Sequence, residues 1–339
     1  MESLFVSSRR RFLKETFAFS ALAALGSVPG VAAPRIADGT GEVNLFAIGD
    51  WGYDKQKEPQ KAVAAALKKY ALDKKVNAEA FLFLGDNWYG ALEGGAQAER
   101  WQTEFEQMYP ADVFNCPAYA ILGNHDYQTW PGNKVEDELE YARLGKSRWT
   151  MPSRYYRFEF PKKKPLITFL ALDTNVPHEN GKGKSNGVDF TMTHEEYDTQ
   201  LKWLEAELQK PRTTPYLVVL GHHPVYSNGQ HGDTATLVRD WDPLLRKYKA
   251  DFYFAGHDHD MQHIEFEGHP TSFFLSGGGG ADLYDLKVDP AKRGPYAQKV
   301  YGFSHLSVTP KKFTLRHLDD KGQLVHAFTR THEGKVEIL

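Results

Sequence analysis

Residues 43–52 read VNLFAIGDWG, a mostly apolar run that ends at a glycine followed directly by a carboxylate. A run of this composition predicts a buried strand over 43–48, with Asp50 just beyond its carboxyl end. The same pattern occurs four more times in the chain. Apolar runs lead into Gly-Asp-Asn, Gly-Asn-His-Asp, Gly-His-His and Gly-His-Asp-His after residues 80–84, 119–122, 217–220 and 252–255. We therefore expect five strands that end alike.

The segments around these strands indicate an α/β fold. Helical spacing of apolar residues predicts helices over 58–72, 98–108, 134–144 and 194–209. After Met261 the sequence alternates like a run of antiparallel strands, so we expect a mixed sheet. The glycine run 277–280 is too short for a flexible linker and predicts a tight loop near the site.

The five polar clusters are expected to converge on one crevice, because ligands of open α/β sheets gather beyond the carboxyl ends of strands. Each preceding glycine allows the chain to turn sharply without a Cβ clash. A helix cap, a turn or a surface histidine explains any one cluster, but not five together. Carboxylate, amide and imidazole donors suit iron, zinc or manganese, and they disfavour copper.

Composition narrows the class of protein. At 339 residues and 41% hydrophobic content the chain can bury a full core, and we expect one catalytic domain. The net charge of −3 gives no indication of a nucleic-acid partner. Cys116 is the sole cysteine, which excludes an intrachain disulfide and a thiolate metal cage.

The first 37 residues differ from the rest. Arg9 and Arg10 precede a mildly apolar run over 17–33, which is shorter than the roughly 20 residues of a membrane-spanning helix. We interpret residues 1–37 as a twin-arginine export signal, removed to leave a mature domain over 38–339. This predicts the export machinery as a partner, a periplasmic or secreted location, and no stable membrane anchor. A frayed basic helix or a short anchor is the alternative.

The motifs Gly-Asp, Gly-Asp-Asn, Gly-Asn-His-Asp, Gly-His and Gly-His-Asp-His, in this order, resemble the calcineurin-like metallophosphoesterase superfamily. Most members carry a histidine two residues after the first aspartate, where this chain has Gly52. Tyr89, three residues after Asp86, looks like the replacement for that ligand and is similar to the tyrosine of small, tartrate-resistant purple acid phosphatases. Stretches that hold no ligand, such as Leu172-Asp173-Thr174, match as well. The resemblance implies a four-layer α/β/β/α sandwich of two mixed sheets.

The resemblance also implies the roles of individual residues. A ferric ion would be held by Asp50, Asp86, Tyr89 and His259, and a divalent iron, zinc or manganese ion by Asp86, Asn124, His222 and His257. Asp86 would bridge both ions, as a carboxylate with two oxygens can. His125 and His231 are the candidates for the acid and for the group that orients the substrate. His223 stands where close members have tyrosine, and it is assigned no role.

These residues predict an acid phosphatase. Two metal ions can clamp a phosphate and stabilise both oxygens of an in-line displacement, and they provide hydroxide at acidic pH. A protonated histidine would serve the leaving alkoxide, so small phosphate monoesters are the expected substrates. Three alternatives remain open: a phosphodiesterase on the same metal pair, an iron-dependent redox protein that handles oxygen species, and a metal-dependent binding protein.

Overall fold

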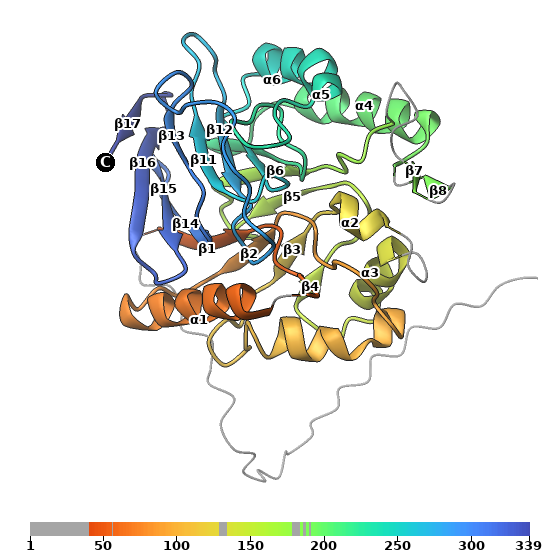
Figure 1. Cartoon of the computed structure of the whole chain (residues 1–339). Helices are drawn as coiled ribbons and strands as arrows, with labels where there is room; N and C mark the ends of the chain where they lie inside the picture. Colours follow the sequence, from red (N-terminus) through yellow and green to blue (C-terminus); the bar gives the residue numbers. More distant parts are fainter. Residues whose placement is uncertain (1–40, 56, 129–133, 178–183, 186–187, 190) are drawn as a thin grey trace, which may run out of the picture. The chain divides into compact units, whose positions relative to one another are not determined.

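Two sheets form the centre of the fold in the computed structural model, which describes residues 41–339 except 56, 129–133, 178–183, 186–187 and 190 (Figure 1). The eight-stranded sheet has the order β17-β16-β15-β14-β1-β2-β3-β4. Its strands are β1 (Val43–Ile48), β2 (Ala80–Phe83), β3 (Ala118–Ala120), β4 (Trp149–Thr150), β14 (Gly302–Val308), β15 (Lys312–Asp319), β16 (Leu324–Thr331) and β17 (Val336–Ile338). Strands β1 to β4 pair in parallel, and β14 pairs with β1 in the antiparallel direction.

The seven-stranded sheet has the order β13-β11-β12-β10-β9-β6-β5. It contains β5 (Tyr156–Phe160), β6 (Ile167–Ala171), β9 (Tyr216–Leu220), β10 (Phe252–Ala255), β11 (Met261–Ile264), β12 (Ser272–Ser276) and β13 (Pro295–Gln298). The segment after Met261 is antiparallel as predicted with one exception: β12 pairs in parallel with β10. The small β7 (Lys184–Ser185) and β8 (Val188–Asp189) pair only with each other.

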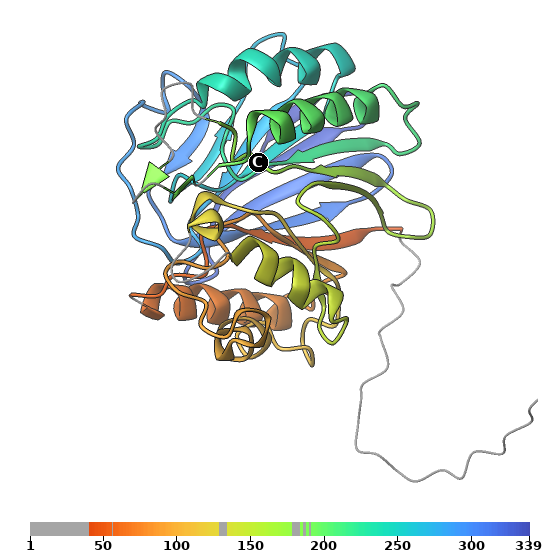
Figure 2. The ribbon, with the colours of Figure 1, turned by 90° about the vertical axis from the view of Figure 1, so that its right-hand side faces the viewer.

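Helices cover the outer face of each sheet, as Figure 2 shows. The helices are α1 (Lys57–Asp73), α2 (Asn124–Tyr127), α3 (Lys134–Arg143), α4 (His194–Leu208), α5 (Ala235–Asp240) and α6 (Asp242–Tyr248), with a 3₁₀ turn η1 (Gly95–Gln97) and a π-helical segment η2 (Trp101–Glu106). The helix predicted over 98–108 is therefore mainly this π-helical segment. Helix α4 begins with a capping box between Thr193 and Glu196.

Aromatic side chains fill the space between the two sheets. Phe252 of β10 lies 4.3 Å from Phe313 of β15, and Phe274 of β12 stacks 4.6 Å from Phe328 of β16, measured between ring centroids. A second core under α4, α5 and α6 contains Leu204, Leu237 and Leu245. Both faces of the central strands are thus covered, which explains their nearly continuous apolar sequences. The predicted four-layer α/β/β/α architecture is confirmed.

The predicted export signal and its removal near residue 37 lie outside the described residues. Within the described part of the chain, every helix is too short or too polar to cross a membrane.

Candidate metal centre

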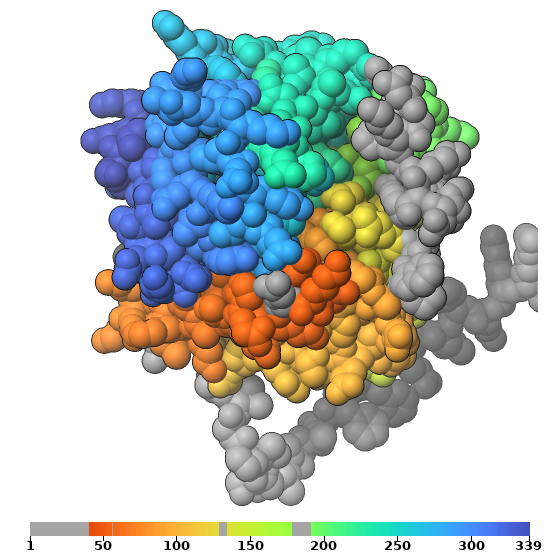
Figure 3. Space-filling model, in the orientation of Figure 1, coloured from red at the N-terminus to blue at the C-terminus, as the bar shows by residue number. Residues whose placement is uncertain are grey.

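The carboxyl ends of parallel strands from both sheets meet at one place. Gly49, after β1, donates its N–H to the carbonyl of Ser276 at the end of β12 (2.7 Å). A Cβ on Gly49 would lie 3.2 Å from the Cα of Gly256, which follows β10. In Figure 3 the orange-red segment after β1 borders a blue segment from the C-terminal part of the chain. The Tyr53 hydroxyl donates to Asp282, in the loop after β12 (2.7 Å). The predicted strand ends therefore meet where the two sheets adjoin.

The glycines before the polar residues are needed mainly because a side chain at these positions would clash with neighbouring segments. A Cβ on Gly123 would lie 2.2 Å from the backbone nitrogen of Asp86, and one on Gly256 would lie 2.5 Å from Asp50 Oδ2. Only Gly85 of the five has a left-handed backbone, with φ +88°. The sharp turns are instead taken by the polar residues Asp50, Asp86 and His257, which corrects the prediction that the glycines make them.

One group of donors contains Asp50, Tyr89 and His259. The Tyr89 hydroxyl donates to Asp50 Oδ1 (3.2 Å) and lies 3.1 Å from Nε2 of His259. His259 Nδ1 donates to the carbonyl oxygen of Asp282 (2.6 Å), which leaves Nε2 as the nitrogen that faces the other donors. All three side chains are buried.

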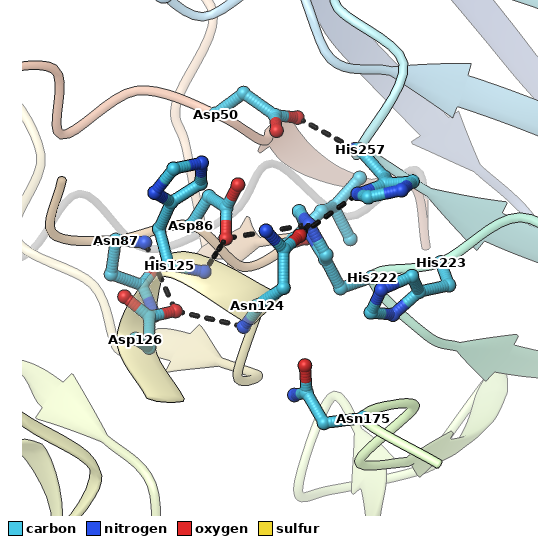
Figure 4. Close-up of polar contacts among 12 residues, drawn as sticks. Asp50, Asp86, Asn87, Asn124, His125, Asp126, Asn175, His222, His223 and His257 are labelled. Carbon is cyan, nitrogen blue, oxygen red and sulfur yellow. Dashed lines mark hydrogen bonds and ion pairs between the residues drawn. The ribbon is translucent and has the colours of Figure 1, made fainter. Parts of the chain in front are cut away.

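A second group contains Asn124, His222 and His257 (Figure 4). Asn124 Oδ1 lies 3.1 Å from Nε2 of His222 and 2.9 Å from Nδ1 of His257. His222 Nδ1 donates to the carbonyl oxygen of Leu84 (2.8 Å), so its Nε2 is free to bind a cation. Burial, joined by repulsion from His223 and His222, lowers the pKa of His257 well below its usual value.

Asp86 lies between the two groups. Its Oδ1 is 3.4 Å from His222 Nε2, and its negative charge contributes to raising the pKa of the Tyr89 phenol on the other side. Burial opposes ionisation of Asp86, but the charges of His222 and His125 outweigh it and hold its pKa well below the usual range. Burial likewise opposes protonation of His222, while Asp86 raises the pKa of that histidine to about 9. Asp86 is thus a buried, ionised carboxylate between the two groups, and a bound cation could take the place of the proton on His222.

The donor set fits metal ions. Ligand atoms of Asp50, Asp86 and His222 all lie within 4.8 Å of one another. Carboxylate, phenolate, amide and imidazole groups are ligands of iron, zinc and manganese. The structure brings together all the residues predicted as ligands from the sequence: Asp50, Asp86, Tyr89, Asn124, His222, His257 and His259.

The two histidines predicted to act on the substrate flank the donors. The backbone N–H of His125 donates to Asp86 Oδ1 (2.7 Å), and its ring lies 4.1 Å from the ring of Tyr89. His231 is exposed, and its ring lies 4.2 Å from that of His257. Both histidines therefore lie beside the donors, His125 against Tyr89 and His231 against His257.

Three further residues at the site escaped the sequence analysis. The Tyr284 ring stacks on His259 at 4.1 Å, and burial with the nearby Asp50 raises its pKa to about 12. The Thr174 hydroxyl lies 2.8 Å from Nδ1 of His223, whose ring is 4.3 Å from His257. Asn175 follows Thr174 and faces the donors in Figure 4. Tyr284 follows the glycine run 277–280, which was the one signal for it.

The fold and this donor set define a metal-dependent hydrolase of the α/β/β/α class. The sequence profile described as calcineurin-like phosphoesterase matches residues 43–261. Human tartrate-resistant acid phosphatase type 5 is 30% identical, with 86% of this chain and 91% of that protein covered. Purple acid phosphatase 7 of Arabidopsis thaliana is 29% identical over 84% of this chain and 85% of its own length.

Two solved structures share the fold. GAP50, described as the anchor in the inner membrane complex of Plasmodium, has a TM-score of 0.68 at 21% identity, with 84% of this chain and 87% of that chain covered. Purple acid phosphatase PPD1 from yellow lupin seeds has a TM-score of 0.60 at 18% identity, with 86% of this chain and 54% of that chain covered. The chain belongs to the calcineurin-like phosphoesterase family, and its similarity to tartrate-resistant and purple acid phosphatases extends over most of its length.

Proposed function

We propose that this protein is an acid phosphatase that hydrolyses phosphate monoesters at a dinuclear metal centre. The observation that carries the proposal is the arrangement of two donor groups that share Asp86: Asp50, Tyr89 and His259 on one side, and Asn124, His222 and His257 on the other. The relatives named acid phosphatases support the reaction class.

The first group would hold a ferric ion, because a phenolate and carboxylates favour a hard trivalent cation. The second group would hold a divalent iron, zinc or manganese ion. When bound, such a pair supplies positive charge for the phosphate and a nucleophile derived from water. His125 would lie against Tyr89 and His231 against His257, and each would donate a proton to the leaving oxygen or hold the phosphate.

The test measures metal content and activity on the same preparation. We expect two metals per chain and hydrolysis of small alkyl and aryl monoesters at acidic pH. A diester and hydrogen peroxide serve as comparison substrates. Faster turnover of the diester would make the protein a phosphodiesterase, and peroxide turnover without ester hydrolysis would make it a redox protein.

We further propose that residues 1–37 direct the folded protein through the twin-arginine route to the periplasm or the medium. Arg9 and Arg10 and the short apolar run after them support this proposal. Replacing both arginines with lysine should retain the precursor inside the cell. Unchanged export of the double variant would count against this route.

A further inference from the structure

The end of β6 forms a sixth polar strand end at the site. Strand β6 pairs in parallel with β9, with Ala171 opposite Leu220, so the residues after β6 emerge beside His222 and His223. The two chains remain in contact beyond the strands, because a Cβ on Gly221 would lie 2.6 Å from the Cγ2 of Thr174. Thr174 Oγ1 also accepts the backbone N–H of His223 (2.8 Å). Asn175 is the next residue.

The carboxamide of Asn175 is held in one orientation. Its backbone N–H and its Nδ2 both donate to Oδ1 of Asp173, at 3.0 and 2.9 Å. Asp173 Oδ2 in turn accepts the hydroxyl of Tyr127 (2.5 Å), and the carbonyl of Asn175 accepts the N–H of Met192 (2.8 Å). Rotating the amide by 180° would place its oxygen against the carboxylate, so Nδ2 stays on Asp173 and Oδ1 points the other way.

That oxygen has no partner. Asn175 is 2% exposed, and within the described structure its Oδ1 is buried without a hydrogen bond. Figure 4 shows Oδ1 directed toward Asn124 and the donor groups. An unpaired buried acceptor costs about 1–3 kcal/mol, and native proteins rarely leave one without a reason. Because this oxygen also faces the donor groups, a group that enters the site can supply the missing donor.

A phosphoryl group is a poor match for this oxygen, because most phosphoryl oxygens are themselves acceptors. A monoester bound with its phosphate at the metal donors carries its O–H or N–H donors on the alcohol that leaves. We propose that Asn175 is a specificity-determining residue whose Oδ1 accepts a hydrogen bond from a hydroxyl or amine on the leaving group. This inference rests on the proposed phosphatase function.

The test uses two substrates that differ in one donor. We would measure kcat/KM of the metal-loaded enzyme for 2-hydroxyethyl phosphate and 2-methoxyethyl phosphate, which have similar leaving groups. The wild type should prefer the hydroxyl compound by on the order of tenfold, the usual worth of a hydrogen bond to a buried acceptor. In Asn175→Leu, which keeps the volume, and in Asn175→Ala, the ratio should fall to about one. Because both substrates are measured on the same variant, the ratio of the two kcat/KM values does not change if a shift of the loop lowers both equally.

Asn228→Ala is the matched control. Asn228 is also fully buried with an unpaired Oδ1, but its Nδ2 donates to the carbonyl of Arg293, in the segment that leads to β13. Its variant should keep the wild-type ratio. A wild-type ratio of one, or a ratio that survives both Asn175 variants, would overturn the proposal. Hydrolysis of the methoxy compound separately tests the phosphatase function, since it needs no donor on the leaving group.

Discussion

Three candidate ligands adopt a backbone conformation that residues other than glycine rarely take. Asp50, Asp86 and His257 have φ values of 57°, 51° and 70°, the left-handed region in which a residue other than glycine costs about 1–3 kcal/mol. Asp50 Oδ2 accepts the N–H of His257 (2.9 Å), so two of these turns hold each other in place. The unusual conformations occur at residues whose side chains belong to the two donor groups, and the surrounding fold compensates for them.

Tyr89 and Tyr284 allow a sharp test of which phenol binds iron. The Tyr89 hydroxyl touches both Asp50 and His259, whereas Tyr284 stacks its ring on His259. We expect the oxidised protein to be violet through charge transfer from Tyr89 to ferric iron. Tyr89→Phe should lose the visible band, and Tyr284→Phe should keep it. A visible spectrum on samples of equal iron content decides, and a colourless wild type with bound iron would exclude Tyr89 as a ligand.

Truncation of the His125 side chain distinguishes a general acid from a metal ligand. Its contact with Asp86 is made by the backbone N–H and survives truncation of the side chain. We expect His125→Ala to keep both metals and to lose turnover by on the order of 10² to 10⁴ on alkyl phosphates. The loss should be smaller on a nitrophenyl phosphate, whose leaving group needs little protonation. Asp86→Ala should instead lose metal and activity together. Equal losses on both substrates would make His125 a phosphate-positioning residue.

At the scale of elements, the loop that carries His231 is attached to the loop that carries two candidate ligands. Asp258, between His257 and His259, accepts the N–H of His231 (2.8 Å) and the hydroxyl of Ser227. A Cβ on Gly229 would lie 2.5 Å from the Asp258 carboxyl carbon. This close packing means that the position of His231 depends on the loop that carries His257 and His259.

This attachment predicts the effects of two variants. Ser227→Ala removes the hydrogen bond to Asp258 together with the two that the hydroxyl accepts from Gly229 and Gln262. Gly229→Ala forces the loop away. Both should lower turnover on alkyl phosphates while metal content stays the same. We expect losses of about three- to tenfold for Ser227→Ala, because the hydrogen bond to Asp258 is the one of the three that bears directly on the anchor of His231. Combined with His231→Ala, either change should add little, because the same contribution is already lost. Fully additive losses in this double-mutant cycle would show that the loop acts independently of His231.

At the scale of the whole molecule, buried histidines link and line the two sheets. His263 of β11 lies 2.9 Å from His326 of β16, between Nδ1 and Nε2, and so joins the seven-stranded sheet to the eight-stranded one. His305 of β14 is 4% exposed and contacts the Tyr70 hydroxyl (3.0 Å) and Asn44 (3.0 Å). Burial lowers the pKa of both His305 and His326 to about 3. These side chains are neutral in the folded protein.

These lowered pKa values make the stability of the folded protein depend on pH. Between the unfolded pKa of about 6.5 and the folded pKa, the unfolded chain binds the proton first, so the free energy of unfolding falls as pH falls. Buried Glu138 and Asp260, whose pKa values are raised by burial, act in the opposite direction. We expect His305→Gln to reduce the loss of stability between pH 7 and pH 4.5 by about 1–3 kcal/mol. Denaturant unfolding at both pH values measures this, with the exposed His332→Gln as control; an identical pH dependence in wild type and His305→Gln would refute it.

The sequence by itself determined which residue types end the strands and hence the chemistry of the site. Strand ends such as Gly49-Asp50 and Gly256-His257 are local features, because an apolar run that stops at a small residue and a donor can be recognised from the sequence alone. The family resemblance then implied which donor belongs to which metal. The two-sheet architecture was predicted from that resemblance, and apolar periodicity alone indicated only a mixed α/β sheet.

Only the tertiary structure decided which other side chains face the site. Asn175 and Tyr284 lie in segments whose sequences resemble ordinary turns, and their direction depends on the pairing of β6 with β9 and on the path of the chain after β12. The tertiary structure also showed that Asp50, Asp86 and His257, and not most of the glycines, make the sharp turns. Close approach between distant segments sets these features, and contacts of that kind leave no local pattern in the sequence.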